Sequence, residues 1–223
     1  MNLDLIHRRQ RDILDHRLLA ELPVTMIGLG ATGSFTATVL SRMGFQKFCL
    51  YDPDVVGEEN LGTQLYGVEN IGQPKVHACR DNLLRSLPHL EIYAHAERYI
   101  DQPLLDGVLV VGVDSMNDRR LIWESVQAQS AESLSVRLLV DARTAGRELH
   151  FHTVRSHRPD EAKRYSESIV PDDQATNMPC TASGASYISS LVAGLIGNQI
   201  VLWCRDEPYK EFFVVFLRDL LVS

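Results

Sequence analysis

Short apolar runs alternate with longer amphipathic segments along most of this chain. The runs predict strands, and the segments between them predict helices. We expect strands at residues 24–28, 47–52, 90–95, 108–114, 137–142, 148–154 and 211–217, and helices at residues 35–43, 74–85, 117–129 and 181–203. Strands that alternate with helices are typical of βαβ units. The sequence therefore predicts an α/β fold, with a Rossmann-like, mostly parallel sheet flanked by helices and an antiparallel C-terminal extension.

Three further segments complete the predicted organisation. Residues 5–20 place apolar side chains among arginines and histidines, which predicts one amphipathic N-terminal helix. Residues 148–154 alternate apolar and polar side chains, as a strand at a sheet edge would. Residues 155–180 show no clear periodicity, and we predict a mobile crossover segment over a site.

Composition narrows the class of protein. The chain has 223 residues, of which 45% are hydrophobic and 23% are charged, a profile typical of a single globular domain over residues 1–223. Asp and Glu number 29 against 22 Lys and Arg, which gives a net charge of -7. Because nonspecific nucleic-acid binding relies on basic surfaces, we expect no nucleic-acid partner.

The sequence also predicts a location in the cell. The N-terminus is charged and has no apolar signal core, and polar residues interrupt the most apolar stretch, residues 187–203. We therefore expect a buried helix there and no membrane partner. The four cysteines are scattered and form neither a disulfide framework nor a CxxC zinc motif. These features together predict a cytoplasmic protein.

A glycine motif follows the first predicted strand and opens a helix. Gly28, Gly30 and Gly33 fit the pattern GxGxxG in that context. The first glycine permits a tight turn, the second lets the backbone approach a phosphate, and the third lets helix and strand pack closely. Asp52 ends the second strand, where a carboxylate commonly binds ribose hydroxyls. Taken alone, these residues predict an adenine-nucleotide site, most often one for NAD.

The loop after Asp52 makes this prediction more specific. It contains Asn60-Leu61, Gln64 and the run IGQPK at residues 71–75. These residues resemble the signature of the ThiF/MoeB/HesA family, the E1-like enzymes that adenylate the C-terminus of ubiquitin-like proteins. The resemblance spans residues 8 to about 200, and its further matches are Arg8 and Arg11, GVDSMNDRR at residues 112–120, and Pro179-Cys180-Thr181.

The resemblance implies a set of ligands and residue roles. ATP and Mg²⁺ are the implied cofactors, with Asp52 at the ATP ribose, Asn60 and Lys75 at phosphate or ribose, and Asp114 at magnesium. Residue chemistry agrees with these roles. The phosphate charges require cations, and Mg²⁺ prefers oxygen ligands such as a carboxylate. Asp114 follows a predicted strand, at the carboxyl edge where open α/β sheets bind their ligands. The resemblance also places Arg11 in the active site of the partner subunit, which implies a homodimer.

Cys180 allows two interpretations. The resemblance places it where many family members carry a cysteine that captures the activated carboxyl group. It also precedes a predicted helix, and a helix N-terminus lowers the pKa of a thiol. The other interpretation is a buried structural cysteine, and the sequence leaves both open.

Some features depart from the family pattern. Thr63 occupies a position where the family has an arginine, so that one cation at the phosphates is missing. We hypothesise that Arg143 or Arg147, after the fifth predicted strand, replaces it. The paired CxxC zinc ligands of many sulfur-carrier activators are also absent. His150 and His152 share one face of a strand, but no third ligand is in view, and we expect a structural role for both.

The sequence as a whole predicts an adenylating enzyme. With ATP, it would convert the C-terminal glycine carboxylate of a small ubiquitin-like or sulfur-carrier protein, or of a peptide, into an acyl-adenylate and release pyrophosphate. A carboxylate is already nucleophilic at neutral pH, so positioning and charge matter more than a strong base. One alternative is a noncatalytic dimer partner, which Thr63 favours. The other is an NAD-linked oxidoreductase. Such an enzyme would need a second substrate domain, and the sequence shows no recognisable one after residue 150.

Overall fold

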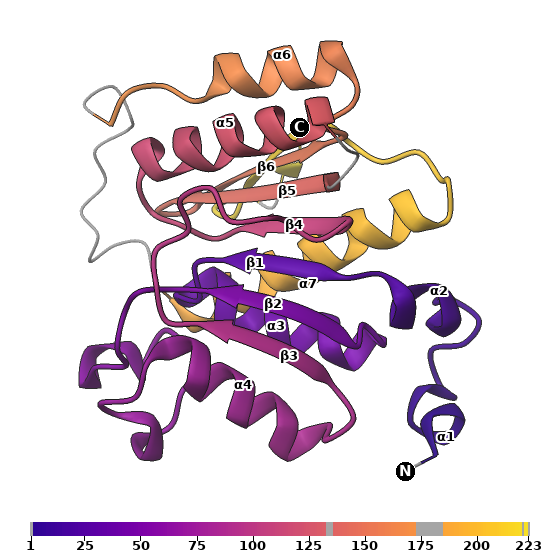
Figure 1. Cartoon of the computed structure of the whole chain (residues 1–223), viewed down its shortest axis with the longest axis vertical. Helices are drawn as coiled ribbons and strands as arrows, with labels where there is room; N and C mark the ends of the chain where they lie inside the picture. Colours follow the sequence, from indigo (N-terminus) through magenta and orange to yellow (C-terminus); the bar gives the residue numbers. More distant parts are fainter. Residues whose placement is uncertain (1, 133–135, 173–184, 220, 223) are drawn as a thin grey trace.

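One mixed β-sheet organises the molecule. The structure is a computed structural model that describes residues 2–132, 136–172, 185–219 and 221–222. The described strands are β1 (Val24–Ile27), β2 (Lys47–Tyr51), β3 (Glu91–His95), β4 (Gly107–Val111), β5 (Val136–Ala145), β6 (Glu148–Val154), β7 (Phe212–Phe216) and β8 (Leu221–Val222). They form an eight-stranded sheet in the order β3-β2-β1-β4-β5-β6-β7-β8 (Figure 1). In this order, the neighbours from β3 through β2, β1 and β4 to β5 pair in parallel, and those from β5 to β8 pair antiparallel. The predicted fold class is confirmed.

Helices cover both faces of this sheet. One apolar cluster packs α3 (Ala31–Met43), α4 (Lys75–Ser86) and α7 (Ser186–Cys204) against one face. A second cluster packs α5 (Met116–Glu132) and α6 (Pro159–Ser168) against the other face (Figure 1). Every residue of β1 and of β4 is buried, as expected for central parallel strands with both faces covered.

Helix α7 lies beside α3. It is long and apolar enough to span a membrane by length and composition, and half of its most apolar window is buried inside the molecule. A Cβ atom on Gly197 would come within 2.8 Å of the Met43 sulfur, so this glycine permits the close approach of the two helices. The buried helix predicted from the sequence is present over the described residues 186–204.

The N-terminal segment differs from the prediction of one helix over residues 5–20. It forms two short helices, α1 (Leu3–His7) and α2 (His16–Glu21), joined by turns. The Asp15 carboxylate accepts hydrogen bonds from the backbone N–H groups of Arg17 and Leu18, and therefore begins a new helix. Amphipathic periodicity alone did not reveal this capping residue.

Two predictions for the C-terminal half also need correction. Strand β6 is not an edge strand, because it lies between β5 and β7. Its alternation arises because Leu149 and Phe151 face the apolar core while His152 lies in a buried polar cluster on the other face. Residues 155–180 were expected to lack regular structure, yet α6 occupies residues 159–168. The mobility of this segment stays a prediction, and its residues 173–180 lie outside the described part of the chain.

Candidate functional site

The glycine motif forms the turn between β1 and α3 at the carboxyl edge of the parallel strands. Gly28 has a φ of +91°, and a Cβ atom there would lie 2.6 Å from the Gly112 carbonyl carbon. A Cβ atom on Gly33 would collide with the carbonyl oxygen of Gly28. Gly30 differs, because the nearest atom to a Cβ there is Nε2 of Gln64, at 4.0 Å. Two glycines are thus required by packing, and the middle one leaves open space beside the backbone.

Asp52 holds this turn against the loop that follows β2. Its Oδ2 accepts the Leu29 N–H at 2.6 Å, and its Oδ1 accepts the Asp54 N–H at 2.8 Å. The side chain is almost fully buried, and burial raises the pKa of Asp52 above its usual value although the two backbone donors oppose this. Asp52 therefore stands where the sequence predicted, and it also orders the backbone of the glycine turn.

Lys75 is the first residue of α4 and points toward the same loop. The residue is only 6% exposed, and its Nζ lies 2.8 Å from Oδ2 of Asp54, a side chain that is 63% exposed. The hydroxyl of Tyr66 donates a hydrogen bond to the Leu29 carbonyl at 2.8 Å, which ties the loop to the glycine turn. Burial raises the pKa of Tyr66, so that the hydroxyl stays a neutral donor. Sequence reasoning missed Tyr66, although it is an aromatic residue inside the signature loop.

The signature loop also contains the short 3-10 helices η1 (Glu58–Asn60) and η2 (Val68–Asn70). Oδ1 of Asn60 accepts the Gly57 N–H at 2.9 Å, so this side chain stabilises the loop. Asn60 is also partly exposed. Thr63 is partly exposed and has no side-chain charge to offer. Oε1 of Gln64 is buried without a hydrogen-bond partner among the described residues. An unpaired acceptor beside Gly30 is a feature that a bound ligand would satisfy.

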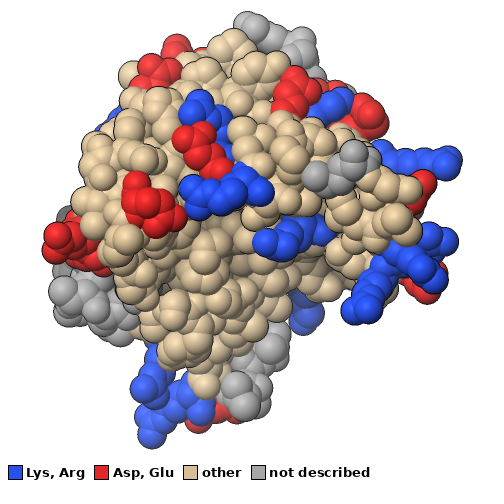
Figure 2. Space-filling view, turned by 90° about the horizontal axis from the view of Figure 1, so that it is seen from below, with Lys and Arg blue, Asp and Glu red and all other residues tan. Residues whose placement is uncertain are grey.

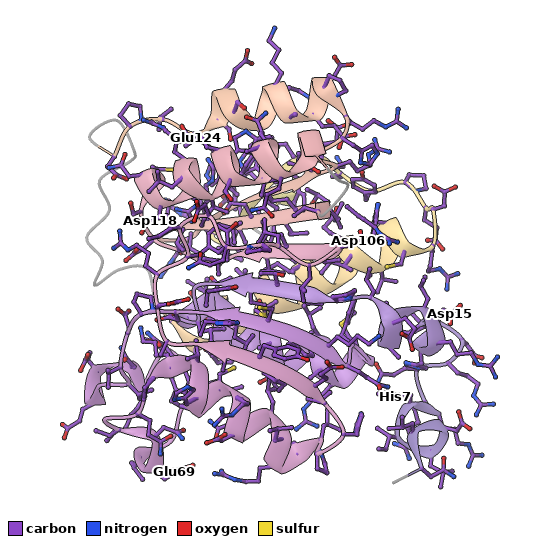
Figure 3. All side chains as sticks on the ribbon, in the orientation of Figure 1. His7, Asp15, Glu69, Asp106, Asp118 and Glu124 are labelled. Carbon is purple, nitrogen blue, oxygen red and sulfur yellow. The ribbon has the colours of Figure 1, made fainter. Side chains whose placement is uncertain are left out.

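Asp114 lies at the same edge, just beyond β4. Its side chain is exposed, and the described residues offer its carboxylate no hydrogen bond. Ser115 starts α5 by accepting the Asp118 N–H on its Oγ at 3.2 Å, and Asp172 accepts the Met116 N–H at 2.7 Å. Figure 3 shows Asp118 at this edge, on the left. The Asp114 carboxylate is thus open to solvent on an anchored loop.

Two predicted site residues are not brought to this edge. Arg11 is exposed in the turns between α1 and α2. His7 and Asp15, on either side of it in the sequence, lie on the right of Figure 3, on the side away from Asp118. Cys180 lies outside the described residues, and both interpretations of it stay open.

A buried polar cluster beside the site was not predicted. Asp141 of β5 is fully buried and accepts hydrogen bonds from Nε of Arg119 at 3.0 Å, Nε of Arg143 at 2.7 Å and the Tyr165 hydroxyl at 3.1 Å. Burial disfavours the charged carboxylate, but the two guanidinium groups hold the pKa of Asp141 well below its usual range. Burial lowers the pKa of His152, also in this cluster, to about 4, so that His152 is neutral at pH 7.

This cluster changes the interpretation of Arg143. Its Nη1 and Nη2 donate to the carbonyl and the hydroxyl of Ser168, at 2.8 Å and 3.1 Å. With Nε on Asp141, the guanidinium faces the interior rather than a phosphate. Arg147 is exposed in the turn between β5 and β6. The hypothesis that Arg143 replaces the family's phosphate-binding arginine therefore has no support from the geometry.

The residues at this edge fit a nucleotide with its metal ion. Gly30 leaves space at the backbone, Gln64 offers an unpaired acceptor, and Lys75 supplies a cation. Asp114 is the exposed carboxylate that could hold Mg²⁺. In the described part of the chain no group of three or more His, Cys, Asp or Glu side chains could hold a metal ion, so a metal here would need ligands from the nucleotide and water.

The fold and the glycine turn define the class of this protein as a Rossmann-like α/β domain, with a candidate ligand site at the carboxyl edge of its parallel strands. The profile of the ThiF family matches residues 7–215. The chain therefore belongs to the ThiF family, as the resemblance indicated.

Relatives of known name match the chain over less than half of its length. It is 31% identical over 97 residues to tRNA threonylcarbamoyladenosine dehydratase 1 of Saccharomyces cerevisiae, covering 43% of this chain and 23% of the relative. It is 32% identical over 88 residues to ubiquitin-like modifier-activating enzyme 5 of Caenorhabditis elegans, covering 40% and 21%. It is 35% identical over 82 residues to molybdopterin-synthase adenylyltransferase of Salmonella typhimurium, covering 36% and 33%. The matches thus span a third or less of each relative.

Solved structures share the fold over nearly the whole chain. PaaA superposes with a TM-score of 0.76 at 17% identity, covering 100% of this chain and 73% of PaaA. E. coli MccB with ATP superposes with a TM-score of 0.71 at 15% identity, covering 93% of this chain and 64% of MccB. At these identities the likeness establishes the fold alone.

Proposed function

We propose that this protein uses ATP and Mg²⁺ to adenylate a carboxylate at the C-terminus of a small ubiquitin-like or sulfur-carrier protein, or of a peptide, with release of pyrophosphate. The observation that carries the proposal is the convergence of an open glycine turn, a buried lysine and an exposed carboxylate at one edge of the sheet. Membership of the ThiF family and relatives named as activating enzymes or adenylyltransferases support it. Membership of the ThiF family also favours this proposal over an NAD-linked oxidoreductase.

The chemistry needs positioning and charge more than proton transfer. The substrate carboxylate attacks the α-phosphorus of ATP, and the bond from that phosphorus to the bridging oxygen of pyrophosphate breaks. Lys75 now pairs with Asp54, an exposed carboxylate, so that an incoming phosphate can compete for its ammonium group. Asp52 and Tyr66 keep the backbone of the glycine turn in place. Mg²⁺ on Asp114 would neutralise phosphate charge.

The surface near the signature loop suits a protein partner. Figure 2 views the molecule from the side of α4 and this loop, and residues other than Lys, Arg, Asp and Glu cover most of the face, with charged residues of both signs set in it and at its rim. Four apolar side chains of the loop are exposed, namely Val55, Leu65, Val68 and Ile71. For this exposed apolar surface we propose two partners, a second copy of the chain and a carrier protein. We also propose that the protein is located in the cytoplasm.

ATP–pyrophosphate exchange tests the proposal directly. Separate reactions should contain no acceptor, ubiquitin-like proteins that end in Gly-Gly, short peptides, or tRNA, the last because one relative is named as a tRNA-modifying enzyme. We expect exchange that depends on a carboxylate substrate and disappears in Asp114→Ala and Lys75→Ala. Exchange that is unaffected by Asp114→Ala would contradict the assigned metal ligand. If the protein binds ATP tightly but shows no pyrophosphate exchange with any of these acceptors, the second candidate is favoured instead.

That second candidate is a noncatalytic partner of another E1-like chain. Thr63, where the family has an arginine, favours it, and Arg143 does not restore the missing cation. The exposed Asp114 and the buried Lys75 would have no use in such a protein, and for this reason we place the enzyme first.

A further inference from the structure

Asp141 joins three segments that meet behind the candidate site. It lies on β5 in register with Val111, the last residue of β4, and Asp114 follows three residues later. Its Oδ1 accepts from Arg119 in the first turns of α5, and its Oδ2 accepts from Arg143 on its own strand. A single buried carboxylate therefore contacts α5 at Arg119, β5 at Arg143 and α6 at Tyr165, and it reaches the end of α6 through Arg143.

Arg119 carries this contact to the loop that bears Asp114. Its Nε binds Asp141 at 3.0 Å, and its Nη1 donates to the Ser115 carbonyl at 3.4 Å. Ser115 is the residue directly after Asp114, and the Arg119 side chain is only 5% exposed. The Ser115 carbonyl, which also accepts the Arg119 N–H at 3.2 Å, is thus held one residue after Asp114 by a guanidinium that Asp141 orients.

Arg143 carries the same contact to the crossover. Its Nη1 and Nη2 bind the carbonyl and hydroxyl of Ser168, where α6 ends. Four residues later Asp172 accepts hydrogen bonds from the Met116 N–H and the Ser115 hydroxyl. Residues 168 and 172 are therefore both fixed to the elements around the Asp114 loop.

We propose that Asp141 is a positioning residue that sets the affinity of the site for Mg²⁺ by fixing, through Arg119, the loop that presents Asp114. The inference rests on the proposed function, because it assigns magnesium to Asp114. Asp141 itself is fully buried and touches neither metal nor nucleotide. Partners of this kind, which orient the groups that bind a metal, commonly affect metal affinity when they are changed.

The test measures binding of the ATP analogue AMPCPP, whose α and β phosphates are joined by a methylene group, at increasing free Mg²⁺. Asp141→Asn keeps the shape of the side chain and removes its charge. Arg119→Lys keeps the positive charge, but a single ammonium cannot bridge Asp141 and the Ser115 carbonyl in the same way. In both variants we expect the Mg²⁺ midpoint to rise by at least about tenfold, while AMPCPP affinity without metal stays within about twofold.

Asp106→Asn is the matched control. Asp106 binds Nε and Nη2 of Arg137 at 2.7 Å and 2.6 Å, an ion pair at the opposite edge of the sheet (Figure 3). This variant makes the same chemical change and should keep the wild-type midpoint. Circular dichroism establishes which variants are folded, and Arg119→Lys decides the outcome if Asp141→Asn does not fold.

Folded Arg119→Lys and Asp141→Asn proteins with the wild-type Mg²⁺ midpoint would overturn the inference and leave the proposed function intact. A midpoint that rises equally in Asp106→Asn would also overturn it, because the effect would then be general destabilisation. The proposed function itself fails if Mg²⁺ does not strengthen AMPCPP binding to the wild type, or if Asp114→Ala keeps the full gain. In that case the assignment of Asp141 fails with it.

Discussion

Changing the motif glycines to alanine one at a time should separate nucleotide binding from folding. Gly28 has a φ of +91° and Gly112 against it, so Gly28→Ala adds backbone strain and a collision. We expect a loss of about 3 kcal/mol in the free energy of unfolding, or a fall of about 6–12 °C in Tm. Gly30 has a φ of −69°, outside the left-handed region, and the nearest atom to its Cβ position is Nε2 of Gln64 at 4.0 Å. Gly30→Ala should therefore cost at least about 1 kcal/mol less than Gly28→Ala.

The effects on ligand binding should be reversed. A methyl group on Gly30 occupies the open side of the turn, where a phosphate must approach the backbone, and we expect at least about a tenfold loss of AMPCPP affinity, or 1.4 kcal/mol. Thermal unfolding and isothermal titration measure the two quantities. Gly62→Ala, in the signature loop, is the matched control, because a Cβ there also meets no atom within 4 Å. A stable Gly30→Ala protein that binds AMPCPP as tightly as the wild type would refute the reasoning.

Three further changes test other parts of the structure. Lys75→Met should keep the fold, because the methionine fills the same buried space, but should weaken AMPCPP binding by about tenfold or more in titration calorimetry. The pKa of His152 is about 4 in the folded protein against about 6.5 when unfolded, so its contribution of about 3 kcal/mol is present above pH 6.5 and is lost as the pH falls toward 4. Urea unfolding should show this loss in the wild type and a flatter profile in His152→Gln. Asp15→Ala removes the cap of α2 and should cost about 1 kcal/mol in the same assay, whereas Asp12→Ala, on an exposed turn, should cost less than about 0.5 kcal/mol.

The parts of the fold that sequence could predict are those encoded by neighbouring residues. The central strands β1 and β4 are short, largely apolar runs that are buried throughout, and the glycine turn must follow directly after such a strand, so both were predictable. The prediction of one N-terminal helix was wrong because a single capping side chain, Asp15, begins a new helix within that segment. The prediction of an edge strand for β6 was wrong for another reason. A polar side chain on a strand, such as His152, can contact either water or a buried polar cluster, and the sequence pattern is the same in both cases.

The polar cluster was out of reach of sequence reasoning for a different reason. Asp141, Arg119 and Tyr165 are separated by more than twenty residues from one another, and each is an ordinary charged or aromatic residue in its own segment. Only the pairing of β4 with β5 and the packing of α5 and α6 bring them together. Arg143 was expected at a phosphate because its strand ends at the correct edge, and the direction of the side chain is set by these long-range partners.

The position of Arg11 makes the predicted dimer testable without knowledge of its interface. Within one chain Arg11 lies between α1 and α2, on the other side of the molecule from the start of α4, where Lys75 stands, so it can serve a nucleotide site only if that site belongs to another copy (Figure 1). Arg11→Ala and Lys75→Ala should then each abolish exchange alone. In an equal mixture about half of the dimers carry both changes on different chains and retain one intact site, so exchange should recover to about a quarter of the wild-type rate. A mixture that stays inactive although subunits exchange would show that Arg11 does not act across a dimer.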